Sequence, residues 1–356
     1  MIYDAIVVGA GPSGSKTAEL LAASGKDVLL LEEHQNIGNP VQCTGIDSHR
    51  ILTLSEAPKS IVMNKVRKAR FYSQDENYLE LESKKAVYVI DRHKLDEEIA
   101  KRAKKAGAEI LTSTKFLNFN RKTSYLEIKT NKGVFKSKLL VGADGPNSTV
   151  AKTANIKLPR EYVIGYQETI KHDFSDNIVE LWFGSKITPD FFAWVVPENK
   201  QWARVGLAAK KNVVHYFKKF VEMRFDQKFE KKDILGGVIR YGLIKDSMAD
   251  NILLVGDAAS QVKPYSGGGI IYGLIGAKFA ASACLKCLNK NRFDYNFLKE
   301  NYDNEWKNKL APAIKRGMVL HRSLHIIPDW LMSFGITISK PFSPILNNLD
   351  MDLLFD

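Results

Sequence analysis

Residues 2–33 read IYDAIVVGAGPSGSKTAELLAASGKDVLLLEE, and this stretch decides the fold. Its apolar start predicts a β-strand over residues 1–8, and the Ala- and Leu-rich run behind it predicts a helix over residues 15–24. A second apolar run at residues 28–31 predicts another strand. The chain therefore begins with a β-α-β unit, which is typical of α/β domains with a parallel sheet.

Between the first strand and the helix, glycine recurs in the spacing G-x-G-x-x-G, at Gly9, Gly11 and Gly14. Glycines at this spacing permit a tight turn, a close approach of the backbone to a pyrophosphate, and close packing of the helix on the strand. Glu32 follows about 20 residues later, where a carboxylate can accept hydrogen bonds from ribose hydroxyls. The pattern predicts a site for NAD or FAD. The alternative is a glycine-rich turn in an ordinary α/β domain.

The composition is that of a globular protein. Of 356 residues, 45% are hydrophobic and 26% are charged, so we expect one two-lobed unit or two joined domains with a full core. No apolar stretch of about 18 residues is free of charge, so no membrane-spanning helix is expected. The first strand leaves no room for a signal peptide, and three cysteines favour a reducing compartment. We therefore expect a cytoplasmic protein.

The formal net charge is +12, and lysines cluster at 101–105, 210–211, 218–219 and 231–232. Such clusters are typical of solvated helix faces. They also suit an anionic membrane surface, an anionic lipid substrate or an acidic electron donor. Nucleic-acid binding is not expected, because the chain has no basic stripe interleaved with aromatic residues.

Apolar and polar residues alternate from 162 to 209, which predicts an antiparallel sheet in a lobe inserted into the α/β framework. Strands are also expected at 66–72 and 78–82, as a hairpin, and at 87–90, 109–113, 116–121, 126–129, 139–142 and 252–255. Helices are expected at 46–55, at 92–106 after the cap Asp91, at 213–224, and from 273 onward with breaks at Pro312, Pro328, Pro341 and Pro344.

Two distant segments place an acid beside a glycine at the end of an apolar strand: Asp144-Gly145 and Gly256-Asp257. An acid in that place is suited to hold a sugar or ribityl hydroxyl near a helix N-terminus. The glycine motif with Glu32, followed by Asp144-Gly145 and then by Gly256-Asp257, indicates a dinucleotide site more specifically than any one of these elements alone.

Together these motifs resemble the FAD-dependent oxidoreductases of the para-hydroxybenzoate hydroxylase fold, and within them the geranylgeranyl reductase family. The resemblance covers most of residues 1–285 and is carried by Gly9-x-Gly11-x-x-Gly14, Pro40-Val41-Gln42-Cys43-Thr44-Gly45, Asp91-Arg92-x-x-Leu95-Asp96, Asp144-Gly145-x-x-Ser148, Phe192-x-Trp194-x-Val196-Pro197, Gly256-Asp257-Ala258-Ala259 and Lys263-Pro264-x-x-Gly267-Gly268-Gly269-Ile270. It implies an α/β chain with a Rossmann-type FAD-binding domain (1–65, 86–158 and 246–290), a substrate-binding β-sheet lobe (66–85 and 159–245) and a C-terminal helical region (291–356).

The resemblance also implies roles for individual residues. Glu32 would bind the adenosine ribose, Arg92 would lie along the FAD phosphates, and Asp257 would bind the ribityl or pyrophosphate region. Residues 267–269 would pass close to the isoalloxazine ring, where backbone N–H groups can stabilise the reduced flavin. The full set of expected cofactor-binding residues is Gly9, Gly11, Pro12, Ser13, Gly14, Glu32, Glu33, Cys43, Thr44, Gly45, Arg92, Ala143, Asp144, Gly145, Gly256, Asp257, Gly267, Gly268, Gly269 and Ile270.

Cys43 is the expected catalytic residue. In the family a Cys-x-x-Gly-type motif lies near the flavin, and Cys43-Thr44-Gly45 is similar but one residue shorter. Cys43 would be a proton donor, a redox partner or a positioning group. The alternative is a small buried hydrophobic residue.

Phe192, Trp194 and Pro197 are expected to bind substrate, because this segment resembles the family's Tyr-x-Trp-x-Phe-Pro motif in the apolar lobe. Phe192 and Val196 depart from that motif, which leaves the chain length and head group of the substrate open. The alternative is a buried strand with aromatic packing. Hydroxylases of this fold often carry Arg where this chain has Ala151, so direct use of NADPH does not follow from the resemblance.

The implied activity is FAD-dependent saturation of isolated C=C bonds in geranylgeranyl (isoprenoid) chains of membrane-lipid precursors. The acid would be Cys43 or an ordered water, and the electron donor NAD(P)H, ferredoxin or another reductant. The apolar segment 326–355 is either a helical cap on the FAD domain or a rim that contacts the inner face of the cell membrane peripherally. Alternatives are a monooxygenase or halogenase, a dehydrogenase passing electrons to quinone, and a non-catalytic FAD-binding protein.

No metal site is expected. Cys284 and Cys287 share one face of a helix, and packing is the favoured interpretation, because zinc would need two more soft ligands. His321 and His325 are also four residues apart on a helix and lack a third partner, so we interpret them as structural.

Overall fold

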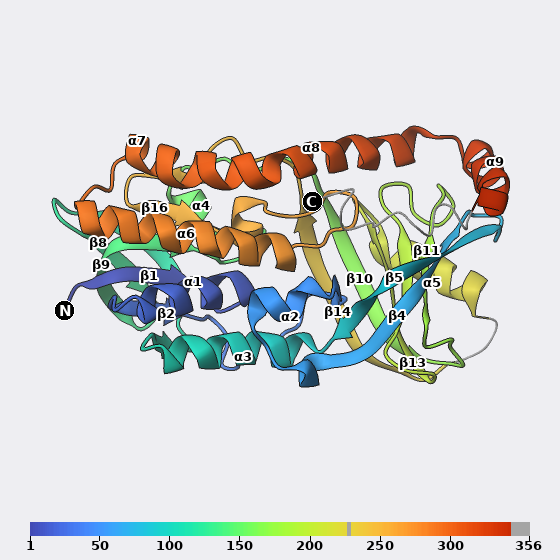
Figure 1. Cartoon of the computed structure of the whole chain (residues 1–356), viewed down its shortest axis with the longest axis horizontal. Coiled ribbons are helices and arrows are strands. Elements are labelled where there is room, and N and C mark those ends of the chain that lie inside the picture. The colour runs from blue at the N-terminus through green and yellow to red at the C-terminus, as the bar shows by residue number, and fades with distance from the viewer. Residues whose placement is uncertain (226–228, 343–356) are drawn as a thin grey trace.

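The computed structural model describes residues 1–225 and 229–342. A mainly parallel sheet with the order β15-β16-β9-β1-β2-β6 forms one end of the elongated molecule, and the hairpin β7–β8 extends it from β9 (Figure 1). Its strands are β1 Tyr3–Val8, β2 Val28–Leu31, β6 Glu109–Leu111, β7 Phe116–Arg121, β8 Leu126–Thr130, β9 Gly133–Gly142, β15 Met248–Ala249 and β16 Ile252–Leu254. Strands β1 and β2 are buried on both faces, as expected for parallel strands between layers.

Helices α1 (Pro12–Ala23), α3 (Arg92–Lys105) and α6 (Ile270–Lys290) pack together on this sheet. Asp91 caps α3 as predicted, since its side chain accepts a hydrogen bond from the Lys94 amide. By length and composition α6 alone, among the described helices, could cross a membrane. However, 67% of its most apolar window is buried inside the protein, as in the core helix of a globular domain.

A second sheet forms the other end of the molecule, with the order β14-β10-β13-β12-β11-β4-β5-β3. Its strands are β3 Ile46–Ser48, β4 Val62–Tyr72, β5 Tyr78–Ile90, β10 Tyr162–Lys171, β11 Ile178–Trp182, β12 Ala193–Pro197, β13 Trp202–Ala209 and β14 Lys231–Arg240. Helix α5 (Val213–Arg224) contacts β10 and β13 and buries Phe217 and Phe220. The predicted antiparallel lobe is confirmed, except that β11 pairs with β4 in parallel.

The remaining elements are short except for one long helix. Helix α8 (Asn304–Ile326) runs along the molecule from the parallel sheet to the second sheet, where α9 (Asp329–Ser339) follows it (Figure 1). The short elements are α2 Arg50–Ser55, α4 Thr149–Thr153, α7 Tyr295–Leu298, η1 Lys59–Ile61, η2 Gly256–Ala259, η3 Lys299–Asp303 and η4 Lys340–Phe342.

Two predictions near the start of the second sheet were wrong. The expected helix at 46–55 is helical only from Arg50, because Ile46 to Ser48 pair with β5 instead. The strands expected at 78–82 and 87–90 are one strand, β5. A register shift opposite Arg67 places extra residues between them, and this bulge interrupts the alternation that a strand prediction uses.

Two further predictions were wrong. Pro312 lies inside α8 and does not break it. Because proline has no N–H, the Asn308 carbonyl loses its helical hydrogen-bond partner. Both residues are exposed, so water can hydrate that carbonyl while the buried residues of α8 hold the helix in place. Strand β14 was missed, since none of its residues is buried and its sequence begins with three charged residues and contains two glycines. Pro328 separates α8 from α9 as predicted, Pro341 lies in η4, and Pro344 lies outside the described residues.

The domain limits stay a prediction. Two of the predicted limits fall inside strands of the second sheet: β4 crosses the limit at 65/66, and β5 crosses the limit at 85/86. Hydrogen bonding is therefore continuous across both limits.

Candidate functional site

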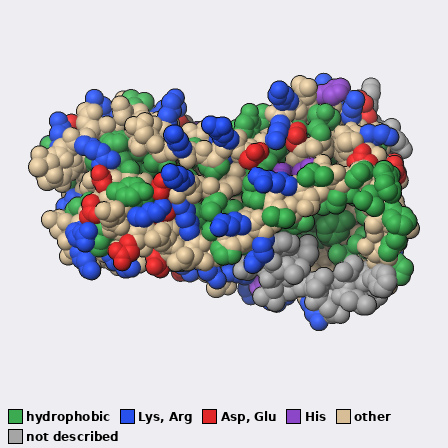
Figure 2. Space-filling model, turned by 90° about the horizontal axis from the view of Figure 1, so that it is seen from above, with side chains coloured by type: hydrophobic (Ala, Val, Ile, Leu, Met, Phe, Trp, Pro, Cys, Tyr) green, Lys and Arg blue, Asp and Glu red, His purple; other side chains and the backbone are tan. Residues whose placement is uncertain are grey.

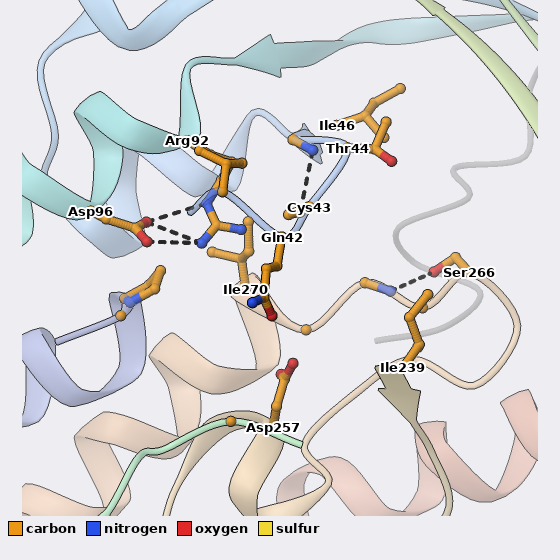
Figure 3. A pocket seen from close by; sticks show the side chains of 18 of the residues that line it. Gln42, Cys43, Thr44, Ile46, Arg92, Asp96, Ile239, Asp257, Ser266 and Ile270 are labelled. Carbon is orange, nitrogen blue, oxygen red and sulfur yellow. Dashed lines mark hydrogen bonds and ion pairs between the residues drawn. The ribbon is translucent and has the colours of Figure 1, made fainter. Parts of the chain in front are cut away.

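A cavity of about 840 Å³ is lined by residues of both sheets. One end is formed by the turn after β1, by residues that follow β2 and β9, and by α3. The other end is formed by apolar residues of the second sheet. The loop at residues 38–49 and the turn at residues 266–270 lie between these ends, as Figure 3 shows in part.

The glycine turn after β1 leaves backbone open to this cavity. Gly9 has a φ of +100°, and a Cβ on it would lie 2.4 Å from the Ala143 oxygen. A Cβ on Gly14 would lie 1.9 Å from the Gly9 oxygen, so helix and turn touch there. A Cβ on Gly11 would meet no atom within 4 Å, because this residue faces the cavity. Gly9 thus forms the turn, Gly14 lets the helix pack on that turn, and Gly11 leaves the backbone open to a ligand.

Glu32 lies at the end of β2, beside the same turn. Its carboxylate accepts hydrogen bonds from the Ala10 amide (2.9 Å) and from the backbone N of His34 (2.9 Å), and it contacts His34 Nδ1 (2.8 Å). Glu33 also lines the cavity and forms an ion pair of 2.8 Å with Lys115. The turn and the acid that follows β2 are therefore held together by a direct hydrogen bond.

The acids Asp144 and Asp257 differ in how the chain satisfies them. Asp144 accepts hydrogen bonds from the Ser148 hydroxyl (2.6 Å) and from the amides of Thr149 (2.7 Å) and Val150 (3.0 Å), and burial still raises its pKa. Burial also raises the pKa of Asp257, which Arg92 opposes. No described residue donates a hydrogen bond to the Asp257 carboxylate, which points into the cavity (Figure 3). Asp257 therefore has acceptor capacity for a ligand.

Arg92, the first residue of α3, joins the acid Asp96 to the Cys43 loop. Its guanidinium donates to Asp96 over 3.1 and 3.2 Å, and both side chains are largely buried. Burial lowers the pKa of Arg92, but Asp96 and Cys43 outweigh this effect and raise it overall. Arg92 is therefore a fixed positive charge beside the thiol (Figure 3).

The loop Cys43-Thr44-Gly45 is tied to the second sheet by residues that sequence reasoning missed. Cys43 Sγ accepts a hydrogen bond from the Gly45 amide (3.2 Å). Gln167 Oε1, on β10, accepts from both the Thr44 hydroxyl (2.8 Å) and the Trp194 indole N–H (2.9 Å). The position of Cys43 is thus coupled to the apolar lobe. A lone Gln in an alternating strand gave no signal for this role.

Arg204, on β13, was missed as well. It donates to the carbonyl oxygens of Thr44 and Ile90 and forms an ion pair of 2.8 Å with Glu198. Both Arg204 and Glu198 are buried. The sequence predicted β13 only as part of an alternating antiparallel sheet, in which a charged residue is usually exposed, so it gave no signal for this buried ion pair.

The apolar end of the cavity is walled by side chains from five strands and the loop before β12. Trp194 is 8% exposed, and its ring lies over Gly206, where a Cβ would come within 2.6 Å of the indole. The apolar lining residues of this end are Val66, Ala69, Phe71, Leu81, Val87, Val179, Leu181, Phe191, Phe192, Trp194, Val196, Val238 and Ile239. This surface suits an apolar ligand.

The turn at residues 266–270 lies between the two ends. Gly267 has a φ of +71°, and a Cβ on it would lie 3.2 Å from Ile239 and 3.6 Å from Phe191. A Cβ on Gly269 would lie 2.4 Å from the Asp257 carboxylate. Glycine is therefore required here by both backbone conformation and space.

Most residues expected at the site line the cavity; Gly14, Gly256 and Pro197 do not. Gly14 packs on Gly9, and Gly256 has a φ of +66° and lies against Ser13. Pro197 ends β12 and pairs with Ala203. Lining residues that the sequence did not single out for a role include His34, Gln42, His49, Arg67, Lys68, Asp96, Thr114, Asn147 and Ser266.

The other candidate residues lie away from the cavity. Cys284 and Cys287 are fully buried on α6, and burial raises the pKa of Cys287 to about 12. His321 Nε2 lies 3.0 Å from the Tyr241 hydroxyl, and burial lowers the pKa of His321 to about 4. Across residues 1–225 and 229–342, no His, Cys, Asp or Glu group has the arrangement of a metal site.

The cavity fits an FAD on three observations. The backbone at Gly11 is open, the half-buried Asp257 carboxylate has no donor among the described residues, and the space continues from the glycine turn to the apolar lobe. A pyrophosphate, a ribityl chain and a flat ring need these features in that order.

Comparisons with known proteins agree with this fit. The family model described as "FAD binding domain" matches residues 2–282. Digeranylgeranylglycerophospholipid reductase of Methanocaldococcus jannaschii is 31% identical, covering 86% of this chain and 83% of its own. The structure of a geranylgeranyl bacteriochlorophyll reductase-like protein from Thermoplasma acidophilum is 25% identical, with a TM-score of 0.87 over 95% of this chain and 91% of that chain.

A more distant structure shares the fold alone. The p-nitrophenol 4-monooxygenase of Pseudomonas putida is 16% identical, with a TM-score of 0.73 over 91% of this chain and 89% of its own. The match to the family model, over residues 2–282, spans both sheets and every residue that lines the cavity between them. The protein is thus an FAD-dependent oxidoreductase, and the chain belongs to the FAD-binding-domain flavoproteins of the geranylgeranyl reductase family.

Proposed function

We propose that this protein reduces isolated C=C bonds in the geranylgeranyl chains of a membrane-lipid precursor, working in the cytoplasm at the inner face of the membrane. The observation that carries the proposal is the placement of Cys43. Its thiol lies between a polar cavity end that fits FAD and an apolar end that fits a prenyl chain, with the guanidinium of Arg92 beside it. The names of the related reductases support the same substrate class.

The chemistry requires an acid. An isolated alkene has no electron-withdrawing group, so addition of hydride is favourable only as a proton reaches the other carbon. FAD, held by the glycine turn, Asp257 and residues 267–269, supplies the hydride when bound and reduced. Cys43 supplies the proton to the second carbon of the C=C bond, directly or through a water. Each turnover thus adds two hydrogen atoms to one double bond.

Arg92 and the Gly45 amide assist Cys43 in this role. Loss of the proton leaves a thiolate, and the nearby guanidinium and the amide at 3.2 Å stabilise that negative charge. Asp96 holds the guanidinium in place. The ion pair thereby keeps a positive charge beside the Cys43 loop.

The apolar wall orients the chain and excludes water. Phe192 and Trp194 contact the prenyl groups, and the aromatic stack of Phe191 on Phe192, with ring centroids 4.4 Å apart, closes one side. Because the wall carries few polar groups, it selects the prenyl chain by shape more than by hydrogen bonds.

The electron donor is NAD(P)H, ferredoxin or another reductant. Ala151, at a position where hydroxylases of this fold often carry Arg, is fully buried on α4 and offers no charge to a nicotinamide dinucleotide. We therefore favour a protein reductant, and stopped-flow reduction of the flavin by ferredoxin or by NADPH under anaerobic conditions distinguishes the two.

The test uses the purified flavoprotein, reduced anaerobically with dithionite and mixed with a geranylgeranyl phospholipid precursor. Flavin reoxidation together with a product heavier by two hydrogen atoms per reduced bond is expected. A flavin that stays reduced with every prenyl lipid, and yields an oxygenated product only in the presence of O₂, would instead identify a monooxygenase.

A further inference from the structure

Helix α9 is attached to the second sheet by its polar face. Asp329 accepts hydrogen bonds from the amide (3.0 Å) and hydroxyl (2.5 Å) of Ser185. One turn on, the Ser333 hydroxyl contacts the hydroxyl of Ser73 and a carboxylate oxygen of Asp75, both at 2.8 Å. The polar side chains thus point toward the protein.

The next turn repeats this pattern. Thr337 accepts a hydrogen bond from the Asn77 amide (2.7 Å), and Lys340, just after the helix, donates to Asn77 as well. Residues 329, 333 and 337 are four apart and define one stripe of the helix. The whole stripe binds the turn between β4 and β5 and the loop after β11.

The apolar stripe of α9 points outward. Trp330, Phe334 and Ile338 are 69%, 56% and 51% exposed, and Leu331 is 40% exposed. None of the 11 residues of α9 is buried. A surface helix of a globular protein normally buries its apolar stripe and exposes its polar one, so α9 has the reverse orientation. Figure 2 shows hydrophobic side chains gathered at this end of the molecule.

We propose that α9 docks the protein on an anionic lipid membrane by inserting its outward apolar stripe. Trp, Phe and Leu on one face of a short helix are the composition of helices that lie in the membrane interface. The net charge of +12 on the chain fits an anionic surface, and Lys315, Arg316, Arg322 and Lys340 are exposed bases on α8 or just after α9. The described acids that contact the helix, Asp329 and Asp75, are hydrogen-bonded to Ser185 and Ser333 on its protein-facing side.

The docking site lies beside the wall of the cavity. The turn that holds α9 joins β4 to β5, and both strands line the apolar end of the cavity, for example at Phe71 and Leu81. A protein docked through α9 thus presents this hairpin to the bilayer, which is the source of a prenyl lipid. The transfer of a prenyl lipid from the bilayer to the cavity rests on the proposed function, whereas docking of α9 on the membrane does not.

The test is sedimentation of the full-length flavoprotein with vesicles of phosphatidylcholine, with and without phosphatidylglycerol. Binding is expected with phosphatidylglycerol, and the Trp330→Ser/Phe334→Ser variant is expected to bind at least about tenfold more weakly. The matched control is Leu117→Ser/Val134→Ser, which removes two side chains of similar exposure, 49% and 57%, from the hairpin β7–β8 and the start of β9, and should bind like the wild type. The flavin spectrum and thermal unfolding of each variant confirm folding.

Equal vesicle binding by the wild type and the α9 variant would overturn the proposal. So would a wild-type dimer, measured by sedimentation velocity, that the α9 variant abolishes, since a second copy would then cover the stripe. Trp330 fluorescence, taken as the difference between wild type and Trp330→Phe, should be accessible to acrylamide without vesicles; a shielded Trp330 would also contradict it. These readouts need no turnover. Reduction of a detergent-solubilised prenyl lipid separately tests the proposed function, and the α9 variant should retain it.

Discussion

At the polar end of the cavity, the groups that fit FAD follow directly on strands: the glycine turn after β1, Glu32 after β2, and Asp257 shortly after β16. At the apolar end, the lining residues alternate along strands that are far apart in sequence, such as β4, β11 and β12. The first end depends on backbone conformation, which a short motif encodes. The second depends on packing between distant strands, which no short motif encodes.

The difference has a consequence for mutation. Substitutions of the turn glycines at the polar end should abolish FAD binding, because the geometry admits only glycine at some positions, whereas replacing an acid there should only weaken FAD binding. Substitutions at the apolar end change side chains on a sheet that keeps its hydrogen bonds, so they should alter turnover in a protein that still holds FAD. Five predictions test this division.

The largest effect is expected from Gly14→Ala. The added Cβ would lie 1.9 Å from the Gly9 oxygen and 2.9 Å from the Ala143 side chain, so α1 cannot stay against the turn. We expect an apoprotein, or loss of soluble protein, with a destabilisation above about 4 kcal/mol. Flavin absorbance of the purified protein measures this result. Gly25→Ala is a control, since a Cβ there meets no atom, although its φ of +72° adds backbone strain. An FAD-bound Gly14→Ala protein would contradict the prediction.

Cys43→Ala should leave the flavin in place and remove the proposed proton donor. A general acid typically contributes about 100-fold or more to the rate, so single-turnover reoxidation of the reduced flavin by prenyl lipid should slow by that factor. Cys43→Ser retains a weaker donor and should give an intermediate rate. If the Cys43→Ala rate equals that of the wild type, the acid is another group, and Cys43 only packs in the loop.

Asp257→Asn tests whether the Asp257 carboxylate binds FAD or stabilises the protein. The Asp257 carboxylate is half-buried and has no donor among the described residues, so removing its charge should not destabilise the apoprotein. FAD should bind about 10- to 100-fold more weakly, the usual worth of a hydrogen bond to a charged group. Asp144→Asn is the comparison: it weakens three hydrogen bonds within the chain and should lower stability instead. Urea unfolding and FAD titration distinguish the two.

The difference between local motifs and contacts of distant strands also explains which features could be predicted from the sequence. Gly9, Gly11 and Gly14, the cap Asp91 and the strands of the parallel sheet were predictable, because each signal is local. Gln167 and Arg204 were not: each acts on the Thr44 loop, more than 100 residues away, and only strand pairing brings them together. The exposure of the α9 stripe could not be read either, because helical spacing shows that an apolar face exists and not which way it points.

Gln167→Leu tests whether the apolar lobe holds the catalytic loop. The substitution leaves the Trp194 indole N–H and the Thr44 hydroxyl without their shared acceptor, so we expect a loss of stability of about 2 kcal/mol. Turnover should fall roughly tenfold with FAD retained, because Cys43 is less well placed. Gln167→Glu keeps an acceptor oxygen and should restore most of the rate. Equal losses in both variants would mean that Gln167 serves packing alone.

The smallest effect concerns His321, behind the apolar wall, where its ring lies 5.8 Å from Phe191 and contacts the Tyr241 hydroxyl. Burial, followed by the charges of His325, Lys210 and Arg322, lowers its pKa from 6.5 to about 4, which Asp190 opposes. Between these two values the unfolded chain binds more protons than the folded one. The contribution of His321 to the free energy of unfolding is therefore complete above pH 6.5 and falls as the pH drops toward 4, by about 1 kcal/mol per pH unit.

His321→Gln should flatten that slope in urea unfolding of the holoprotein between pH 6.5 and 5, whereas His215→Gln, on the exposed face of α5, should not. Flavin binding should be the same in all three proteins, since the titrating ring faces away from the polar end. A slope that persists in His321→Gln would place the acid sensitivity in His325, whose pKa burial also lowers, or in a carboxylate such as Asp303, whose pKa burial raises but Lys299 and Lys307 lower overall.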